Sequence, residues 1–163
     1  MARVVLVGLP GVGKSTVGRA LAERWGVDFV DCDEAFVDQW GESVQDVLRR
    51  DGESVFRERE VHVLDQVLRT DAVVATGGGV VTTPQARSLL RAAPTLWLDA
   101  PDAVLVERVR DGDRPLLGDD PLEALARLRS QRSRFYADVA RGHIVVDRDI
   151  DAICDDLERA LEE

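Results

Sequence analysis

A glycine-rich segment at residues 8–15 constrains the fold of this chain more than any other stretch. It reads Gly-Leu-Pro-Gly-Val-Gly-Lys-Ser, which matches the phosphate-binding pattern G-x-x-x-x-G-K-[ST]. The apolar, β-branched run at 4–7 predicts a buried parallel strand before it. Apolar positions on one face of residues 16–25 predict a helix after it. Strand, glycine loop and helix together form the setting in which backbone N–H groups bind phosphate.

The loop predicts a nucleotide site for ATP and Mg²⁺. Lys14 can reach the β- and γ-phosphates, and the Ser15 hydroxyl can ligate Mg²⁺. A chance match in an ordinary glycine turn is the alternative, and the flanking strand and helix argue against it. The residues expected to hold the phosphates are Gly11, Val12, Gly13, Lys14, Ser15 and Thr16.

Composition narrows the class of protein. The 163 residues predict one domain, 1–163, and a content of 45% hydrophobic and 32% charged residues is typical of a soluble globular protein. The net charge of −10 argues against nucleic acid or an anionic membrane as a partner. An ATP site on an acidic body needs local positive charge, so we expect the arginines to cluster.

The cysteines and histidines form no metal-binding pattern. Cys32 and Cys154 lie far apart, and His62 and His143 are the only histidines, which argues against a zinc site. We expect both thiols to be inert buried fillers and both histidines to be structural or exposed. Two thiols without a disulfide framework indicate a reducing, cytoplasmic location. No apolar run is long enough for a secretion leader or a membrane span.

Strands and helices alternate along the rest of the chain. Strands are expected at 27–31, 72–75, 95–98 and 143–146, and helices at 34–40, 44–50, 54–68, 84–91, 102–110, 121–139 and 150–161. This alternation predicts an α/β, three-layer P-loop NTPase fold with a five-stranded parallel sheet flanked by helices. Ligands of such sheets bind beyond the carboxyl ends of the strands. We therefore expect residues 8–14, Asp31, Asp33 and 77–79 to lie in one site.

Two aspartates compete for the metal. Asp99 follows an apolar run, but it precedes a proline and a helix, so we interpret it as a helix N-cap. We expect Asp31 to share Mg²⁺ with Ser15, through water, and Asp33 to meet an acceptor hydroxyl. The polar, glycine-bearing stretch at 111–120 has no regular period, and it predicts a mobile lid.

Further motifs follow the glycine loop in order along the chain. These motifs are Asp31-Cys32-Asp33, Asp51-Gly52-Glu53 followed by Phe56-Arg57, Gly77-Gly78-Gly79, Arg114-Pro115-Leu116-Leu117, and Arg132-Ser133-Arg134-Phe135-Tyr136. The glycine loop alone is common to many NTPases, whereas the ordered set of the other motifs is specific. In this set the chain resembles the shikimate kinases over nearly its whole length.

The resemblance implies ATP-dependent phosphorylation of the 3-hydroxyl of shikimate, on the route to chorismate and aromatic amino acids. It implies that Asp33 meets the shikimate hydroxyls as hydrogen-bond partner and base. It assigns the shikimate carboxylate to Arg57 and Arg132, which can hold it by directed hydrogen bonds. The residues implied around the substrate are Phe56, Gly77, Gly78 and Gly79, with N–H groups from the last two.

The resemblance also implies the nucleotide contacts and the organisation of the chain. Arg114 resembles the lid arginine that closes over the phosphates, which completes a catalytic set with Lys14 and Asp33. Arg108 is similar to the adenine-contacting arginine, and Arg148 is a second candidate whose spacing departs from the pattern. Residues 32–69 would be the acceptor-binding helices, and a monomer is expected.

Other interpretations of these residues remain open. Without the resemblance, Arg57 would be interpreted as one half of a surface ion pair with Glu58 or Glu60. Another small P-loop kinase, acting on gluconate or a nucleoside monophosphate, is one alternative function. A non-catalytic nucleotide-binding module is a second. The tryptophans at 25, 40 and 97 are expected in the core or the pocket wall.

Overall fold

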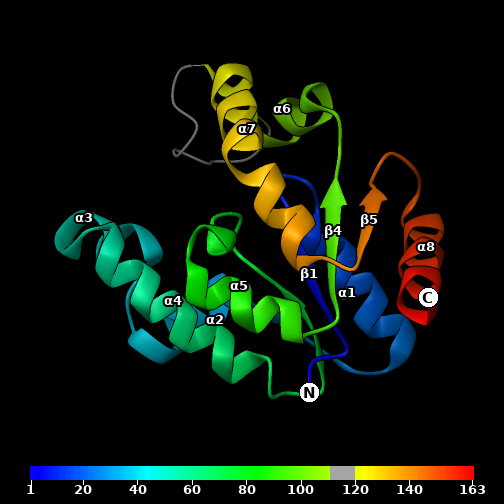
Figure 1. Cartoon of the computed structure of the whole chain (residues 1–163), viewed down its shortest axis with the longest axis horizontal. Helices are drawn as coiled ribbons and strands as arrows, with labels where there is room; N and C mark the ends of the chain where they lie inside the picture. The colour runs from blue at the N-terminus through cyan, green and yellow to red at the C-terminus, as the bar shows by residue number, and fades with distance from the viewer. Residues whose placement is uncertain (111–119) are drawn as a thin grey trace.

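A computed structural model describes residues 1–110 and 120–163 of the chain, and its centre is a parallel sheet (Figure 1). The strands are β1 (Val4–Val7), β2 (Asp28–Asp31), β3 (Ala72–Ala75), β4 (Thr95–Asp99) and β5 (Gly142–Val145). Their spatial order is β2-β3-β1-β4-β5, with every pair parallel. Leu6 lies in register with Ala75 on one side and Leu96 on the other. The expected five-stranded parallel sheet is confirmed.

Helices cover both faces of the sheet, which confirms the three layers. They are α1 (Lys14–Trp25), α2 (Cys32–Trp40), α3 (Val44–Asp51), α4 (Glu53–Val67), α5 (Pro84–Ala92), α6 (Asp102–Arg110), α7 (Pro121–Val139) and α8 (Ile150–Glu162), with a 3₁₀ turn, η1 (Val80–Thr82). α1 packs against α8, whereas α5 packs against α7 and η1. In Figure 1, α2, α3 and α4 lie together at one end of the sheet. None of the described helices has the length and apolar character to cross a membrane.

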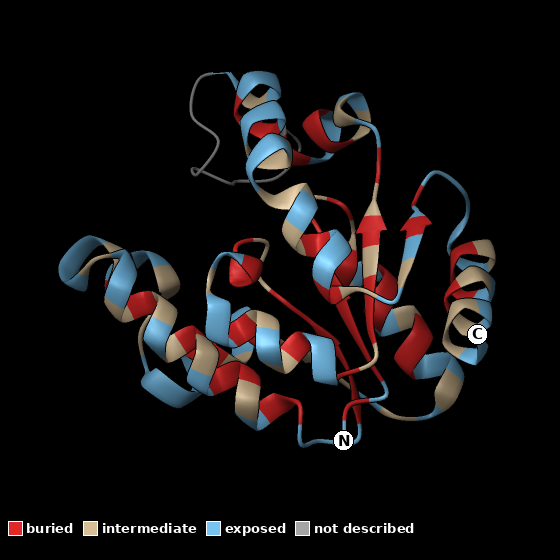
Figure 2. Ribbon diagram, viewed as in Figure 1, coloured by how far each residue is buried: buried red, intermediate tan, exposed pale blue. Residues whose placement is uncertain are grey.

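The core follows the strand pattern. All residues of β1 and β3 are buried, whereas β2 at the sheet edge is partly exposed (Figure 2). Strands covered by helices on both faces need apolar side chains on both sides, which explains the continuous Val, Leu and Ala runs. The buried central strands therefore place their polar carboxyl ends at one edge of a rigid sheet.

Two helices begin two residues earlier than the sequence pattern predicts. α1 begins at Lys14, because Gly13 takes a left-handed conformation with φ of 102° and starts the helix inside the glycine loop. α2 begins at Cys32 because the Asp31 carboxylate accepts hydrogen bonds from the N–H groups of Asp33 and Glu34. In both cases a loop residue of the expected site also caps or starts a helix.

The N-cap interpretation of Asp99 was wrong. α6 begins at Asp102, and the Asp99 carboxylate accepts instead from Arg129 Nη1 at 2.8 Å. Its second oxygen lies 3.2 Å from Nε2 of His143. Sequence spacing could not reveal these partners, because Arg129 and His143 follow Asp99 by 30 and 44 residues.

One tryptophan was also misplaced. Trp40 is 37% exposed, and its ring lies on the surface under the Arg59 guanidinium, 4.5 Å from the ring centroid. Trp25 and Trp97 are partly buried against the core, as expected. Residues 111–119, on which most of the expected lid falls, lie outside the described residues. Asp120, the last residue of the expected lid, caps α7 by accepting from the N–H of Glu123 at 3.2 Å.

Candidate active site

The carboxyl edge of the sheet opens into a cavity of about 860 Å³. Every candidate site residue in the described part of the chain lines it: the loop residues Gly11, Val12, Gly13, Lys14, Ser15 and Thr16, the aspartates Asp31 and Asp33, Phe56, the turn Gly77, Gly78 and Gly79, and the arginines Arg57, Arg108, Arg132 and Arg148. Arg114 lies outside the described residues. The fold therefore brings segments separated by more than 100 residues to one site, and the role of each residue remains a prediction.

The glycine loop presents an anion site at the start of α1. Gly11 and Gly13 have φ values of 83° and 102°, a region that side chains disfavour. No side chain in the described residues caps the N-terminus of α1, so its N–H groups face the cavity edge without a carboxylate competitor. Lys14 is buried and donates from Nζ to the carbonyls of Gly8 at 2.8 Å and Leu9 at 3.1 Å. The loop thus holds its own lysine beside the helix N-terminus.

Ser15 and Asp31 meet as the sequence predicts. The Ser15 hydroxyl donates to Asp31 Oδ2 at 2.7 Å, and the other carboxylate oxygen accepts from the N–H of Asp33 at 2.9 Å. Two hydrogen bonds from different elements thus hold the Asp31 carboxylate beside the phosphate loop. One carboxylate and one hydroxyl suit Mg²⁺, which commonly takes few protein ligands and completes its shell with water and phosphate oxygens. No cluster of three or more His, Cys, Asp or Glu ligands occurs within residues 1–110 and 120–163.

Arg57 is oriented by a buried carboxylate, so the surface-pair interpretation was wrong. Its Nη1 donates to Glu60 Oε1 at 2.8 Å, and the two side chains are only 18% and 8% exposed. Burial raises the pKa of Glu60, and the Arg57 charge opposes that shift. Glu53 approaches the other side of the guanidinium, with its Oε1 3.5 Å from Arg57 Nε.

The turn at 77–79 lies against the side chains of Asp33, Glu60 and Arg57. A Cβ on Gly77 would stand 3.3 Å from both Asp33 Oδ1 and Glu60 Oε2. A Cβ on Gly79 would stand 2.5 Å from Arg57 Nη2, a distance that real Cβ atoms do not reach. A side chain at 79 would therefore displace the Arg57 guanidinium, although the backbone conformation of Gly79 is ordinary.

Two arginines in the cavity have unmet hydrogen-bonding capacity. The Nε atoms of Arg57 and Arg132 are buried and have no hydrogen-bond acceptor among the described residues. A buried donor without an acceptor costs about 1–3 kcal/mol. A small anion that enters the cavity can remove this cost and form charge-assisted hydrogen bonds. The part of the cavity beside Arg57 and Arg132 is thus suited to a carboxylate.

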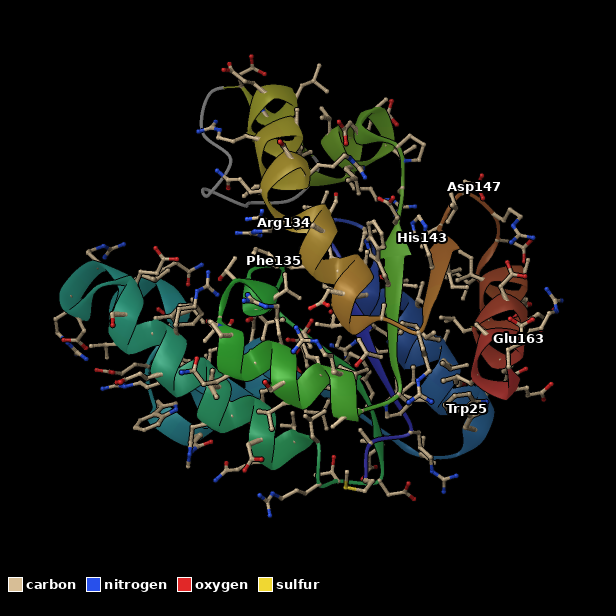
Figure 3. The ribbon with its side chains drawn as sticks, in the orientation of Figure 1. Trp25, Arg134, Phe135, His143, Asp147 and Glu163 are labelled. Carbon is tan, nitrogen blue, oxygen red and sulfur yellow. The ribbon has the colours of Figure 1, made fainter. Side chains whose placement is uncertain are left out.

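The other two cavity arginines come from α6 and from the segment after β5. Arg108 Nη1 donates to the carbonyl of Val12 at 2.7 Å, which holds α6 against the glycine loop. Arg148 follows β5 and pairs with Asp156 and with Asp147, the latter at 3.7 Å from its Nε. Figure 3 shows Asp147 on the loop between β5 and α8. The arginines do cluster around the cavity, as the acidic composition required.

Sequence reasoning missed several lining residues. The cavity is also lined by Gln45, Thr76, Leu128, Val146, Ile150 and Ile153. Thr76 could have been found by the strand-end rule, since it directly follows β3; its Oγ1 donates to the carbonyl of Leu6 at 3.0 Å. The apolar residues on α7 and α8 carry no local signal, because an apolar helix position reads the same whether it faces a core or a cavity.

The thiol beside the site is buried, which supports the expectation of an inert filler. Cys32 lies between the two aspartates in sequence, and its side chain is buried. Burial raises the pKa of this thiol, and the charges of Asp33 and Asp31 add to the shift. Since the thiolate is the reactive form, Cys32 acts as an apolar filler at the start of α2.

Comparison with known proteins gives a consistent result. The family model for shikimate kinase matches residues 10–162. A shikimate kinase from Halorhodospira halophila is 45% identical over 142 residues, which cover 85% of this chain and 80% of that protein. A bifunctional shikimate kinase/3-dehydroquinate synthase from Thermotoga maritima is 42% identical over 140 residues, which cover 85% of this chain and 28% of that longer protein.

Solved structures of small kinases are also similar to this chain. Shikimate kinase from Acinetobacter baumannii in complex with shikimate has a TM-score of 0.87 and 34% sequence identity, covering 98% of this chain and 90% of that chain. A gluconokinase from Sinorhizobium meliloti has a TM-score of 0.65 and 20% identity, covering 98% of this chain and 90% of that one. The similarity to the gluconokinase shows a shared fold and no more.

Proposed function

The chain belongs to the shikimate kinase family, and we propose that it transfers the γ-phosphoryl group of ATP to the 3-hydroxyl of shikimate. The products are shikimate 3-phosphate and ADP, in the pathway to aromatic amino acids. One observation carries the proposal. A single cavity contains a phosphate-binding loop and two arginines whose buried Nε atoms have no acceptor among the described residues.

The nucleotide occupies the loop half of the cavity. The N–H groups of residues 11–16 hold the phosphates, and Lys14 moves from the loop carbonyls to the β- and γ-phosphates. Ser15, and Asp31 through water, would hold Mg²⁺, which would offset the negative charge on the phosphate oxygens. Arg108 and Arg148 flank the adenine end.

The acceptor occupies the other half. Arg57, Arg132 and the backbone N–H groups of Gly78 and Gly79 hold the shikimate carboxylate, with Phe56 beside the ring. Asp33 accepts a hydrogen bond from the attacking hydroxyl and takes its proton. Phosphoryl transfer through a loose transition state needs positioning more than a strong base.

Arg114 completes the catalytic set in this proposal. Its place in the Arg-Pro-Leu-Leu motif supports a role over the phosphates, where a guanidinium stabilises charge on the transferring group. The segment at 111–120 acts as a lid that excludes water and limits wasteful ATP hydrolysis. Residues 32–69 form the acceptor-binding part of a single domain, 1–163. The protein is a cytoplasmic monomer, and gel filtration with light scattering tests its oligomeric state.

The test is ADP release with ATP, Mg²⁺ and a panel of acceptors. We expect ADP formation with shikimate and little with gluconate, AMP or quinate. Gluconate-dependent turnover would favour the alternative small-metabolite kinase. The absence of turnover with every acceptor, despite ATP binding, would favour a non-catalytic nucleotide-binding module. Either result would overturn the proposed function.

A further inference from the structure

Tyr136 lies behind the acceptor half of the cavity and reaches the glycine turn. It is on α7, one helical turn after Arg132, and its side chain is fully buried. Its hydroxyl donates to the carbonyl oxygen of Gly78 at 2.5 Å. The phenol ring packs against Trp97, with ring centroids 5.7 Å apart. The contact joins residues 58 positions apart and spans from α7 to the turn after β3.

By holding the Gly78 carbonyl, this hydrogen bond also fixes the Gly79 N–H. The carbonyl of Gly78 and the N–H of Gly79 belong to one planar unit, and in a trans peptide they point in opposite directions. Holding the Gly78 oxygen toward α7 therefore turns the Gly79 N–H away from α7. Donation to the carbonyl also polarises the amide and strengthens its N–H as a donor. Neither the Gly78 nor the Gly79 N–H donates to a backbone acceptor within the described residues.

The turn needs such a restraint. Glycine backbones have access to more conformations than any other residue, so three consecutive glycines do not specify one peptide orientation by themselves. Pro10 limits the turn on the side of the phosphate loop, since a Cβ on Gly78 would lie 2.9 Å from Pro10 Cδ. Tyr136 supplies the restraint from α7.

Tyr136 also acts on the arginine of its own helix. Residues i and i+4 share one helix face, and the Arg132 guanidinium interacts with the same hydroxyl. Burial raises the pKa of Tyr136 to about 12, with the Arg132 charge opposing that shift. The hydroxyl consequently keeps its proton at neutral pH and donates to Gly78. One side chain thus bonds to the peptide and interacts electrostatically with the guanidinium that we assign to the acceptor carboxylate.

We propose that Tyr136 is a positioning residue for the acceptor carboxylate: through its hydroxyl it sets the Gly78–Gly79 peptide and the Arg132 guanidinium in the geometry that holds this group. Tyr136 does not line the cavity, so it acts through these two neighbours and touches no substrate atom. The inference rests on the proposed function, since it assumes an acceptor with a carboxylate at Arg57 and Arg132.

The test compares Tyr136→Phe with the wild-type protein on two acceptors. One is shikimate, and the other is its primary carboxamide, which keeps the ring and hydroxyls but lacks the negative charge. In the variant we expect KM for shikimate to rise roughly fivefold to tenfold, the effect of one lost hydrogen bond. KM for ATP should stay within about twofold, and kcat/KM for the carboxamide should fall less than that for shikimate, since an uncharged amide oxygen accepts weaker hydrogen bonds from the same donors.

Trp97→Phe is the matched control, because it disturbs packing around the Tyr136 ring but leaves its hydroxyl in place. It should lower the melting temperature without changing the preference for shikimate over the carboxamide. Equal losses on both acceptors in Tyr136→Phe, or an unchanged KM for shikimate, would overturn the inference. The proposed function fails separately, and the inference with it, if the wild-type protein forms no ADP with shikimate.

Discussion

Glu60 places a buried carboxylate beside an arginine that we assign to the acceptor. Because burial raises its pKa, ionising Glu60 in the folded protein costs folding free energy, and this cost is greatest once the pH exceeds its folded pKa. The charge is compensated locally by Arg57, whose Nη1 lies 2.8 Å from Glu60 Oε1. Such a pair gives more to the orientation of Arg57 than to the stability of the fold.

Replacing Glu60 with Gln should weaken shikimate binding selectively. Glutamine keeps the size of the side chain but holds the guanidinium by a weaker, uncharged hydrogen bond. Steady-state kinetics should show KM for shikimate raised about tenfold and KM for ATP within about twofold. Glu58→Gln, an exposed change two residues away, is the control and should leave both constants unaltered. A parallel rise of both constants in Glu60→Gln would contradict a role specific to the acceptor.

Arg129 joins two helices to the end of a strand. Its guanidinium donates to Asp102 at 2.7 Å, Asp99 at 2.8 Å and the carbonyl of Ala100 at 2.6 Å, so α7 is tied to α6 and to the end of β4. The two tied helices carry Arg108 and Arg132, which belong to the two halves of the cavity. The geometry between nucleotide and acceptor therefore depends partly on this contact between elements.

We expect Arg129→Gln to destabilise the fold. The guanidinium is 27% exposed, so the loss should fall below that of a fully buried pair, at about 1–2 kcal/mol. For a chain of this size that is a decrease of roughly 5 °C in melting temperature, measurable by calorimetry. Arg127→Gln, an exposed change on the same helix, should shift it by less than about 1 °C. Equal melting temperatures for both variants would mean that the three contacts of Arg129 contribute nothing to stability.

Across the whole molecule, ion pairs with arginine offset part of the excess negative charge. Arg50 shows this on the surface: its hydrogen bonds lower the pKa of both Glu42 and Asp51. A carboxyl whose folded pKa is lowered adds stability above its unfolded pKa, and this stability is lost as the pH falls through the folded pKa. The melting temperature should therefore decrease as the pH falls from about 5 to about 3.

Arg50→Gln isolates the contribution of these pairs. The variant should be less stable than the wild type at neutral pH, and the difference should shrink as the pH falls and these carboxylates take up protons. Melting curves across this range give the comparison. A difference between the two proteins that stays constant with pH would show that Arg50 acts through packing alone.

The sequence was sufficient for features that depend on near neighbours. The phosphate loop and the apolar runs of the five strands are local patterns, and each occurs in the structure. The strand-end rule also predicted that 8–14, Asp31 and 77–79 share one site. Local information was sufficient there because parallel strands all end at the same edge of the sheet.

The contacts that refine the site were decided by tertiary structure. The partners of Asp99, the burial of the Arg57–Glu60 pair and the bond from Tyr136 to Gly78 depend on how α4, α6 and α7 pack on the sheet. The positions of glycine, arginine and tyrosine in the sequence do not specify which helix face contacts which turn. The phosphate loop by itself predicts where a nucleotide binds. Packing between residues far apart in sequence determines the geometry of the proposed acceptor pocket, because those side chains meet only after the helices have docked on the sheet.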